Sequence, residues 1–302
     1  MRVFLTCLLL FCSVFAEGQS LADLERQLDS LLNKQQKSEV VASLSYGNNP
    51  AYGAKTVNLE QPIVMKAYLS PSLTWYHKSG LTAGASGYYL FDTDKNHWFE
   101  WDFTAGYDYT KKRNFLTGIS YTRYLFADST DVPATPINNE IFSYFYYRKW
   151  WLHMGISLDF GWGSYTSGTR RLKEHVTGSD FNVIATVRHP FIFDGLLFSD
   201  DALLLQPSLS LTTGTANYYS QLSAFRYMGR SPKLKPNKGR PGKVLSYEDH
   251  TGFEPRAIDC TINASYLFHQ FTFSPSFTVF KPLTGPELQL MGYFTARLSY
   301  SF

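Results

Sequence analysis

The sequence has no apolar run long enough to cross a membrane as a helix. Such a span needs about 20 consecutive apolar residues, and the one extended run, at residues 3–15, is shorter and lies at the N-terminus. A helical membrane protein is therefore excluded. The 302-residue chain is nevertheless rich in aromatic residues, with 24 Phe and 21 Tyr, while its mean hydropathy is slightly polar at −0.21. This combination is typical of a protein whose strands each have only one apolar face.

Cysteine is scarce, and two of the three cysteines lie within the first 16 residues. Residues 1–16 combine a charge at Arg2, the apolar run, and Val14 and Ala16 near the end of the run. This pattern predicts a secretory signal peptide that is cleaved after Ala16. Cleavage leaves Cys260 alone, so the mature chain cannot form an intramolecular disulfide even in an oxidising compartment.

Sequence motifs for metal, cofactor and nucleophilic chemistry are also missing. The chain has no metal-ligand spacing, no phosphate-binding glycine loop and no nucleophile elbow. We therefore predict no metal site, no cofactor and no catalytic residue.

From residue 38 to the end, the chain repeats strand, turn and strand, with no helical stretch and no domain-sized linker. Alternating apolar and polar residues predict strands at 38–46, 71–79, 81–91, 98–110, 114–126, 140–149, 151–163, 179–191, 201–215, 257–269, 271–281 and 288–302. These twelve candidates predict a single all-β domain over residues 38–302.

The last candidate strand, LQLMGYFTARLSYSF, has the most informative pattern, because its apolar side chains recur at every second position up to the final residue. The residues that define this pattern are Phe294, Leu298, Tyr300 and Phe302. This strand resembles the C-terminal signature of Gram-negative outer-membrane β-barrel proteins, which their assembly machinery reads. The resemblance implies a transmembrane, antiparallel, up-and-down β-barrel in the outer membrane. It also implies contacts with membrane lipids and lipopolysaccharide, and recognition by the barrel assembly machinery.

The connections between the candidate strands alternate between short and long. The short connections follow the second, fourth, sixth and tenth strands, and the clearest long ones follow the fifth, seventh and ninth. Outer-membrane barrels have short periplasmic turns and longer outer loops, so an even strand number and periplasmic termini follow. Residues 191–200 are an exception, because they form a longer connection on the short side.

The fourth candidate strand indicates which face meets lipid. Phe99, Trp101 and Phe103 begin one face of this strand. Glu100 and Asp102 begin the other face. A cation at the bilayer midplane costs about 2–4 kcal/mol and an acid somewhat less, so we expect the acids to point into the barrel.

The same alternation assigns nine titratable side chains to the lumen: Glu100, Asp102, Asp108, His153, Asp159, Asp180, Arg188, Asp259 and Arg297. Barrels of eight strands are filled by side chains and those of sixteen hold a wide channel, so twelve strands predict a polar lumen of intermediate width. Two interpretations stay open. The charges either pair into a network that satisfies a closed interior, or they line a path for a solute. We therefore expect a passive pore, a solute transporter or a structural barrel.

Residues 17–37 carry a helical pattern, which predicts a short periplasmic segment before the barrel. Four leucines follow a 3-4-3 spacing, with acidic residues early and lysines late. The helix could be an arm that shields its leucines against the barrel, or a coiled-coil seam that joins protomers into a homo-oligomer. Two to three turns are too few to decide between them.

The connection at 216–256 is long, basic and interrupted by proline and glycine. One interpretation is a solvated surface loop that touches lipopolysaccharide phosphates nonspecifically. The other is a gate, or a contact for an anionic ligand, that folds over the barrel mouth. A nucleic-acid partner is not expected on an outer surface, despite the basic run.

An enzyme is the second functional class, since outer-membrane barrels include phospholipases and lipid A deacylases. His77 and Ser79 form an H-x-S pair that resembles part of the deacylase pattern, with the histidine able to serve as base for the serine hydroxyl. The pair lies in a turn expected to be periplasmic, whereas such enzymes act on the outer leaflet. A lipid-modifying hydrolase of the deacylase or phospholipase type is therefore the alternative.

Overall fold

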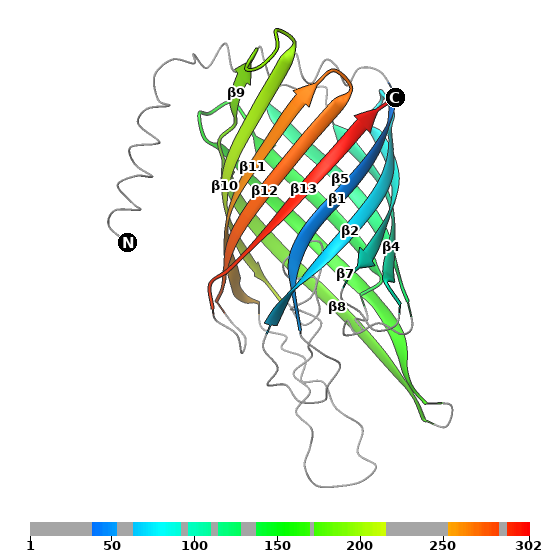
Figure 1. Ribbon diagram of the computed structural model, residues 1–302. Helices are drawn as coiled ribbons and strands as arrows, with labels where there is room; N and C mark the ends of the chain where they lie inside the picture. The colour runs from blue at the N-terminus through cyan, green and yellow to red at the C-terminus, as the bar shows by residue number, and fades with distance from the viewer. Residues whose placement is uncertain are drawn as a thin grey trace. The chain divides into compact units, whose positions relative to one another are not determined.

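The computed structural model describes residues 38–52, 63–91, 96–109, 114–127, 137–169, 172–215, 253–283 and 289–302. The predicted signal peptide at 1–16 and the predicted helix at 17–37 lie outside these residues, as does most of the basic connection at 216–256. All regular elements in the described part are β-strands (Figure 1). None of the described residues forms a helix long and apolar enough to cross a membrane.

The described residues form thirteen strands. In chain order they are β1 (Glu39–Tyr52), β2 (Ile63–Tyr76), β3 (Leu81–Leu90), β4 (Trp98–Tyr109), β5 (Phe115–Phe126), β6 (Asn139–Tyr147), β7 (His153–Thr169), β8 (Leu172–Arg188), β9 (Phe191–Asp194), β10 (Asp201–Gly214), β11 (Glu254–Phe268), β12 (Phe271–Pro282) and β13 (Met291–Ser301). Each of the twelve predicted strands overlaps a strand of the structure, and the one at 179–191 overlaps both β8 and the first residue of β9.

The strands close into an antiparallel barrel. Neighbours in sequence pair with each other around the sheet, and β13 pairs with β1, so the red and blue strands lie side by side in Figure 1. At this seam Ser45 and Arg297 are Cα partners. A closed sheet leaves no unpaired strand edge, which is what a strand-built membrane protein requires. The predicted fold, a barrel of twelve antiparallel strands, is confirmed.

The number is twelve because β8 and β9 occupy one position in the barrel. Both pair with the same edge of β10, and the register is continuous, since Ser208 faces Arg188 and Leu205 faces Phe191. Pro190 lies between the two segments and has no N–H to donate to the ladder. The prediction of a turn beginning at residue 191 is therefore wrong, because the strand resumes after the proline and continues to Asp194.

The turn that follows β9 is held by Asp201. Its carboxylate accepts hydrogen bonds from the backbone N–H groups of Leu196, Leu197 and Phe198 at 2.6, 2.8 and 2.9 Å. It also accepts the hydroxyl of Tyr266 at 2.6 Å. This one side chain satisfies three backbone donors, so the turn stays compact although it is longer than the other connections at this end.

The two ends of the barrel differ as the alternating connection lengths predict. The connections at 77–80, 148–152, 195–200 and 269–270 lie at the same end as the C-terminus, as do the end of β4 and the start of β5 (Figure 1). We call this the inner end, and the opposite one the outer end. The connection between β7 and β8, predicted to be long, comprises only residues 170 and 171, because the two strands extend as a hairpin instead.

The burial of side chains is inverted relative to a soluble protein. In β7, Ile156 and Leu158 remain 47% and 41% exposed, whereas Ser157 and Asp159 between and beside them are 3% and 1% exposed. Apolar side chains on the outside and polar ones on the inside are expected for a barrel surrounded by lipid. The C-terminal residues Phe294, Leu298 and Phe302 follow the same rule, at 40%, 51% and 72% exposure. That the assembly machinery recognises these residues stays a prediction.

One residue departs from the predicted faces. Phe99, expected to meet lipid, is 1% exposed and packs with Tyr68 and Leu90 inside the barrel. The ladder between β3 and β4 shifts register at Tyr88 and Tyr89, which leaves Phe99 as an extra residue. A β-bulge of this kind re-aims a side chain, so the strict alternation fails at this point.

Candidate functional site: the barrel lumen

The pairing register shows where the predicted lumen residues lie. All nine stand on the face that alternates with the exposed apolar side chains, on β4, β7, β8, β11 and β13. They do not form one cluster. Their participation in a solute path stays a prediction.

Four of the nine gather on one side of the barrel, together with a fifth acid that the sequence reasoning missed. We call this set the acid wall; its members are Glu100, Asp102, Glu140, Asp159 and Asp180. All five side chains are 0–4% exposed. Within the wall, Gly161 on β7 faces Glu140 on β6 and Asp180 on β8. A Cβ at residue 161 would lie 2.8 Å from Ile137 Cγ2, so the glycine leaves space for the buried Ile137 side chain.

Neutral donors on neighbouring strands orient four of these carboxylates. The bonds are Tyr124 Oη to Glu140 Oε2 at 3.0 Å, Thr215 Oγ1 to Asp180 Oδ1 at 3.0 Å, Asn182 Nδ2 to Asp159 Oδ2 at 3.3 Å and Ser86 Oγ to Asp102 Oδ2 at 3.4 Å. A carboxylate that leaves water needs such partners. The acid wall is therefore built into the ladder and is not a set of flexible surface acids.

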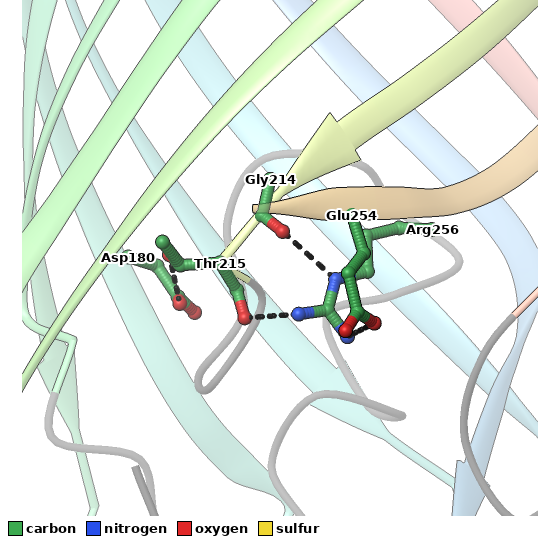
Figure 2. Close-up of polar contacts among 5 residues, drawn as sticks. All are labelled: Asp180, Gly214, Thr215, Glu254 and Arg256. Carbon is green, nitrogen blue, oxygen red and sulfur yellow. Dashed lines mark hydrogen bonds and ion pairs between the residues drawn. The ribbon is translucent and has the colours of Figure 1, made fainter. Parts of the chain in front are cut away.

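The outer rim of this wall is fixed by the network in Figure 2. Thr215 follows β10 and donates its hydroxyl to Asp180 of β8. Arg256 of β11 donates from Nε to the carbonyl oxygen of Gly214 at 2.9 Å and from Nη2 to that of Thr215. Its Nη1 also lies 4.0 Å from Glu254 Oε2. The network joins β8, β10 and β11 where the last two diverge.

The opposite side of the lumen is lined by small hydroxyl residues. In a ring of twelve strands, β13 stands six positions from β6. Its inward Arg297 donates from Nε to Ser45 Oγ at 3.0 Å, and the same wall carries Ser70 and Thr278. Arg297 is exposed although it faces inward. The lumen beside it is therefore wide enough to hold solvent.

The remaining predicted residues lie apart from the acid wall. Asp108 accepts the Tyr144 hydroxyl at 2.5 Å in the inner half of the barrel. Asp259 faces Ser210 and Phe280 across the ladders of β11. His153 and Arg188 are Cα partners at the inner ends of β7 and β8.

Glu140 was missed because its strand gives no clear alternation. In β6, Ile141 and Phe145 on one face alternate with Phe142 and Tyr144 on the other, so both faces read as apolar or aromatic. The pairing of Glu140 with Thr122 and Gly161 is what places it inside. Strand pairing, which sequence alone does not supply, was needed to find it.

The candidate hydrolase pair occupies a turn at the inner end. His77 Nδ1 lies 2.7 Å from Ser79 Oγ, but the same nitrogen also accepts the backbone N–H of Ser79 at 3.3 Å. The turn is closed by the Gly80 N–H bond to the His77 carbonyl at 2.8 Å. These contacts describe a local turn motif. Among the described residues, no group of three His, Cys, Asp or Glu side chains is arranged to hold a metal ion.

No protein-family model and no curated protein matches the sequence. Solved structures of similar shape include the NanC porin, with 9% identity, a TM-score of 0.44, and coverage of 86% of this chain and 98% of that one. They also include the COG4313 outer membrane channel from Pseudomonas putida F1, with 10% identity, a TM-score of 0.46 and coverage of 88% and 96%. The translocator domain of the autotransporter NalP from Neisseria meningitidis has 11% identity, a TM-score of 0.44 and coverage of 93% and 95%.

The geometry and burial together place the protein in a membrane. The barrel is closed, its exterior is apolar and its interior is polar, which are the properties of outer-membrane barrels. The protein is an outer-membrane β-barrel.

Proposed function

We propose that this protein is a narrow, cation-preferring pore for small hydrophilic solutes. The observation that carries the proposal is the change in exposure along the lumen. In the inner half, Arg297 is exposed and Tyr76 is 36% exposed, although both face inward. In the outer half, the acid wall is 0–4% exposed. The lumen thus combines a solvated inner vestibule with a tightly packed, acidic constriction.

Packing in the outer half supports a narrow constriction. Tyr68, Leu90 and Phe99 form a buried apolar cluster at 5%, 0% and 1% exposure, with Tyr88 packed against it. Because this apolar cluster fills part of the lumen, the polar part that remains lies beside the acid wall. A permeating solute would therefore pass close to carboxylates.

Electrostatics then favour cations. In a narrow and poorly hydrated passage a fixed charge is weakly screened and acts strongly on an ion at short range. The acid wall supplies five carboxylates on one side, whereas the facing strand β13 supplies Arg297. An arrangement of this kind attracts cations into the constriction and disfavours anions.

Selectivity measurements on a charge variant test this proposal. Asp102→Asn keeps the shape and removes one carboxylate from the constriction. The reversal potential in a KCl gradient should shift away from cation selectivity relative to the unaltered protein. Glu39→Gln is the matched control: Glu39 also faces inward, but it lies at the inner rim, where it accepts the Ser301 hydroxyl at 2.6 Å. Its charge is screened by salt in a wide opening, so selectivity should hold.

Two outcomes would contradict the proposal. A conducting barrel whose selectivity is unchanged in Asp102→Asn and in the companion Glu100→Gln would mean that these acids serve only a structural network. Equal shifts in Asp102→Asn and Glu39→Gln would mean that the constriction is not at the acid wall.

A further inference from the structure

The inner end of the lumen carries a second cluster of charged groups, opposite in sign to the acid wall and not used by the proposed pore. Arg188 is the last residue of β8 and His153 the first of β7, and they face each other across the ladder. Arg148 directly follows β6. Tyr146, near the end of β6, completes the set. We call these four residues the inner basic cluster.

Arg188 is the central observation. Its guanidinium carbon lies 3.8 Å from the centroid of the Tyr146 ring, and its Nε is buried without a hydrogen-bond partner. Within the part of the chain that the structure describes, no carboxylate or carbonyl group accepts a hydrogen bond from this guanidinium. An arginine offers five N–H donors in a fixed fork. A cation–π contact attracts the charge but accepts none of these hydrogens in the plane of the fork.

The position of the Tyr146 ring is built into the sheet. Tyr146 faces Gly155 of β7 across the ladder, and a Cβ at residue 155 would lie 2.1 Å from Tyr146 Cδ1. The glycine therefore leaves the space that the ring fills. The ring in turn lies beside the Arg188 guanidinium. This stack fixes the guanidinium on the lumen wall.

Arg148 adds positive potential at the same place, and His153 lies beside it. The charges of Arg148 and Arg188 are close enough to repel each other. His153, 7% exposed, hydrogen-bonds the backbone of Arg148. Two guanidinium groups that repel each other are stabilised when an anion binds between or beside them.

We propose that the inner basic cluster binds a small oxyanion, a carboxylate or a phosphate, through the guanidinium of Arg188. The planar fork of an arginine matches two oxygens of either group, and charge-assisted hydrogen bonds of this type are among the strongest in proteins. Arg148 supplies additional positive charge, and the imidazole of His153 can supply an N–H donor. Binding requires no conduction, so this site and the proposed pore can each fail without the other.

Calorimetric titration of the purified full-length barrel in detergent tests the site. Inorganic phosphate and acetate serve as probes in separate titrations at constant ionic strength. We expect saturable binding of at least one of them, weakened about tenfold or more in Arg188→Gln because charge-assisted hydrogen bonds are lost. Arg297→Gln is the matched control, since it removes the same charge from the lumen at a distant strand; its affinity should stay within about twofold of that of the unaltered protein. Tighter binding of phosphate or of acetate then identifies the source of the oxyanion.

Three outcomes would overturn the proposal. The first is the absence of saturable binding of both probes to the unaltered protein, which needs no variant. The second is an equal loss of affinity in Arg297→Gln and Arg188→Gln, because general lumen charge would then explain the binding. The third applies if Arg188→Gln does not fold, as judged by heat-modifiable gel mobility. Arg188→Lys keeps the charge but loses the fork, and an affinity equal to that of the unaltered protein would then refute the role of the guanidinium.

Discussion

Replacing Leu158 with arginine tests the position of the barrel in the bilayer. Leu158 lies on the outer face of β7, 41% exposed, five residues from the inner end of the strand at His153. At about 3.3 Å per residue and a tilt of about 40°, these five residues rise about 13 Å, which is half of the roughly 25 Å apolar band. Leu158 is therefore expected at the midplane. A cation there costs about 2–4 kcal/mol, which corresponds to a factor of about 30 to 1,000 in the folding equilibrium.

Leu125→Arg provides the control at a different depth. Leu125 is 47% exposed on the same outer face, but it lies ten residues from the inner end of β5 at Phe115. The same arithmetic gives about 25 Å, which is the outer boundary of the band, where a cation costs about 0–1 kcal/mol. Urea-dependent folding into lipid vesicles, followed by tryptophan fluorescence and gel mobility, measures both changes. Equal costs at the two sites, or no cost at Leu158, would refute the assignment of the outer face and its depth.

Three further predictions concern assembly, topology and packing. Deleting Phe302 should reduce the amount of membrane-inserted protein, because the last strand is expected to be recognised during assembly. The residue also helps to close the sheet, since its backbone N–H donates to the Val40 carbonyl oxygen at 2.9 Å. Normal levels of heat-modifiable protein after the deletion would contradict this prediction. In a background without the native cysteine, Lys238→Cys between β10 and β11 should react with an impermeant maleimide on whole cells, and Lys112→Cys between β4 and β5 should not; the reverse pattern would invert the barrel. Gly155→Ala should destabilise the barrel by about 1–3 kcal/mol in vesicle unfolding experiments, because its Cβ would lie 2.1 Å from Tyr146 Cδ1; unchanged stability would show that the ring is free to move.

Strands with one polar and one apolar face could be predicted from the sequence. β7 is the best example, because Ile156 and Leu158 alternate with Ser157 and Asp159, and the structure places these pairs outside and inside. The hydrocarbon requires an apolar side chain at every second position, and this requirement leaves a period of two in the sequence. The twelve strands and the inward orientation of most acids follow from it.

Features that depend on strand pairing could not be predicted. The bulge beside Tyr89 turns Phe99 inward, and nothing in the alternation of β4 marks it. The sequence predicts no strand for the outer part of the hairpin formed by β7 and β8, because residues 164–178 have no apolar face and sequence alone cannot separate such a strand from a loop. The contact between Arg188 and Tyr146 joins residues 42 apart in sequence. The contact depends on the pairing of β6 with β7 and of β7 with β8, which brings the two residues together.

Single-channel recording from the purified protein in planar bilayers tests the central claim most directly. The account predicts discrete conductance steps, smaller than those expected of a wide sixteen-stranded channel, with a reversal potential that favours cations in a KCl gradient. Lipid hydrolysis assayed on the same preparation should be absent. A preparation that is folded and inserted by gel mobility but never conducts above background would contradict the proposed pore and would favour a structural barrel.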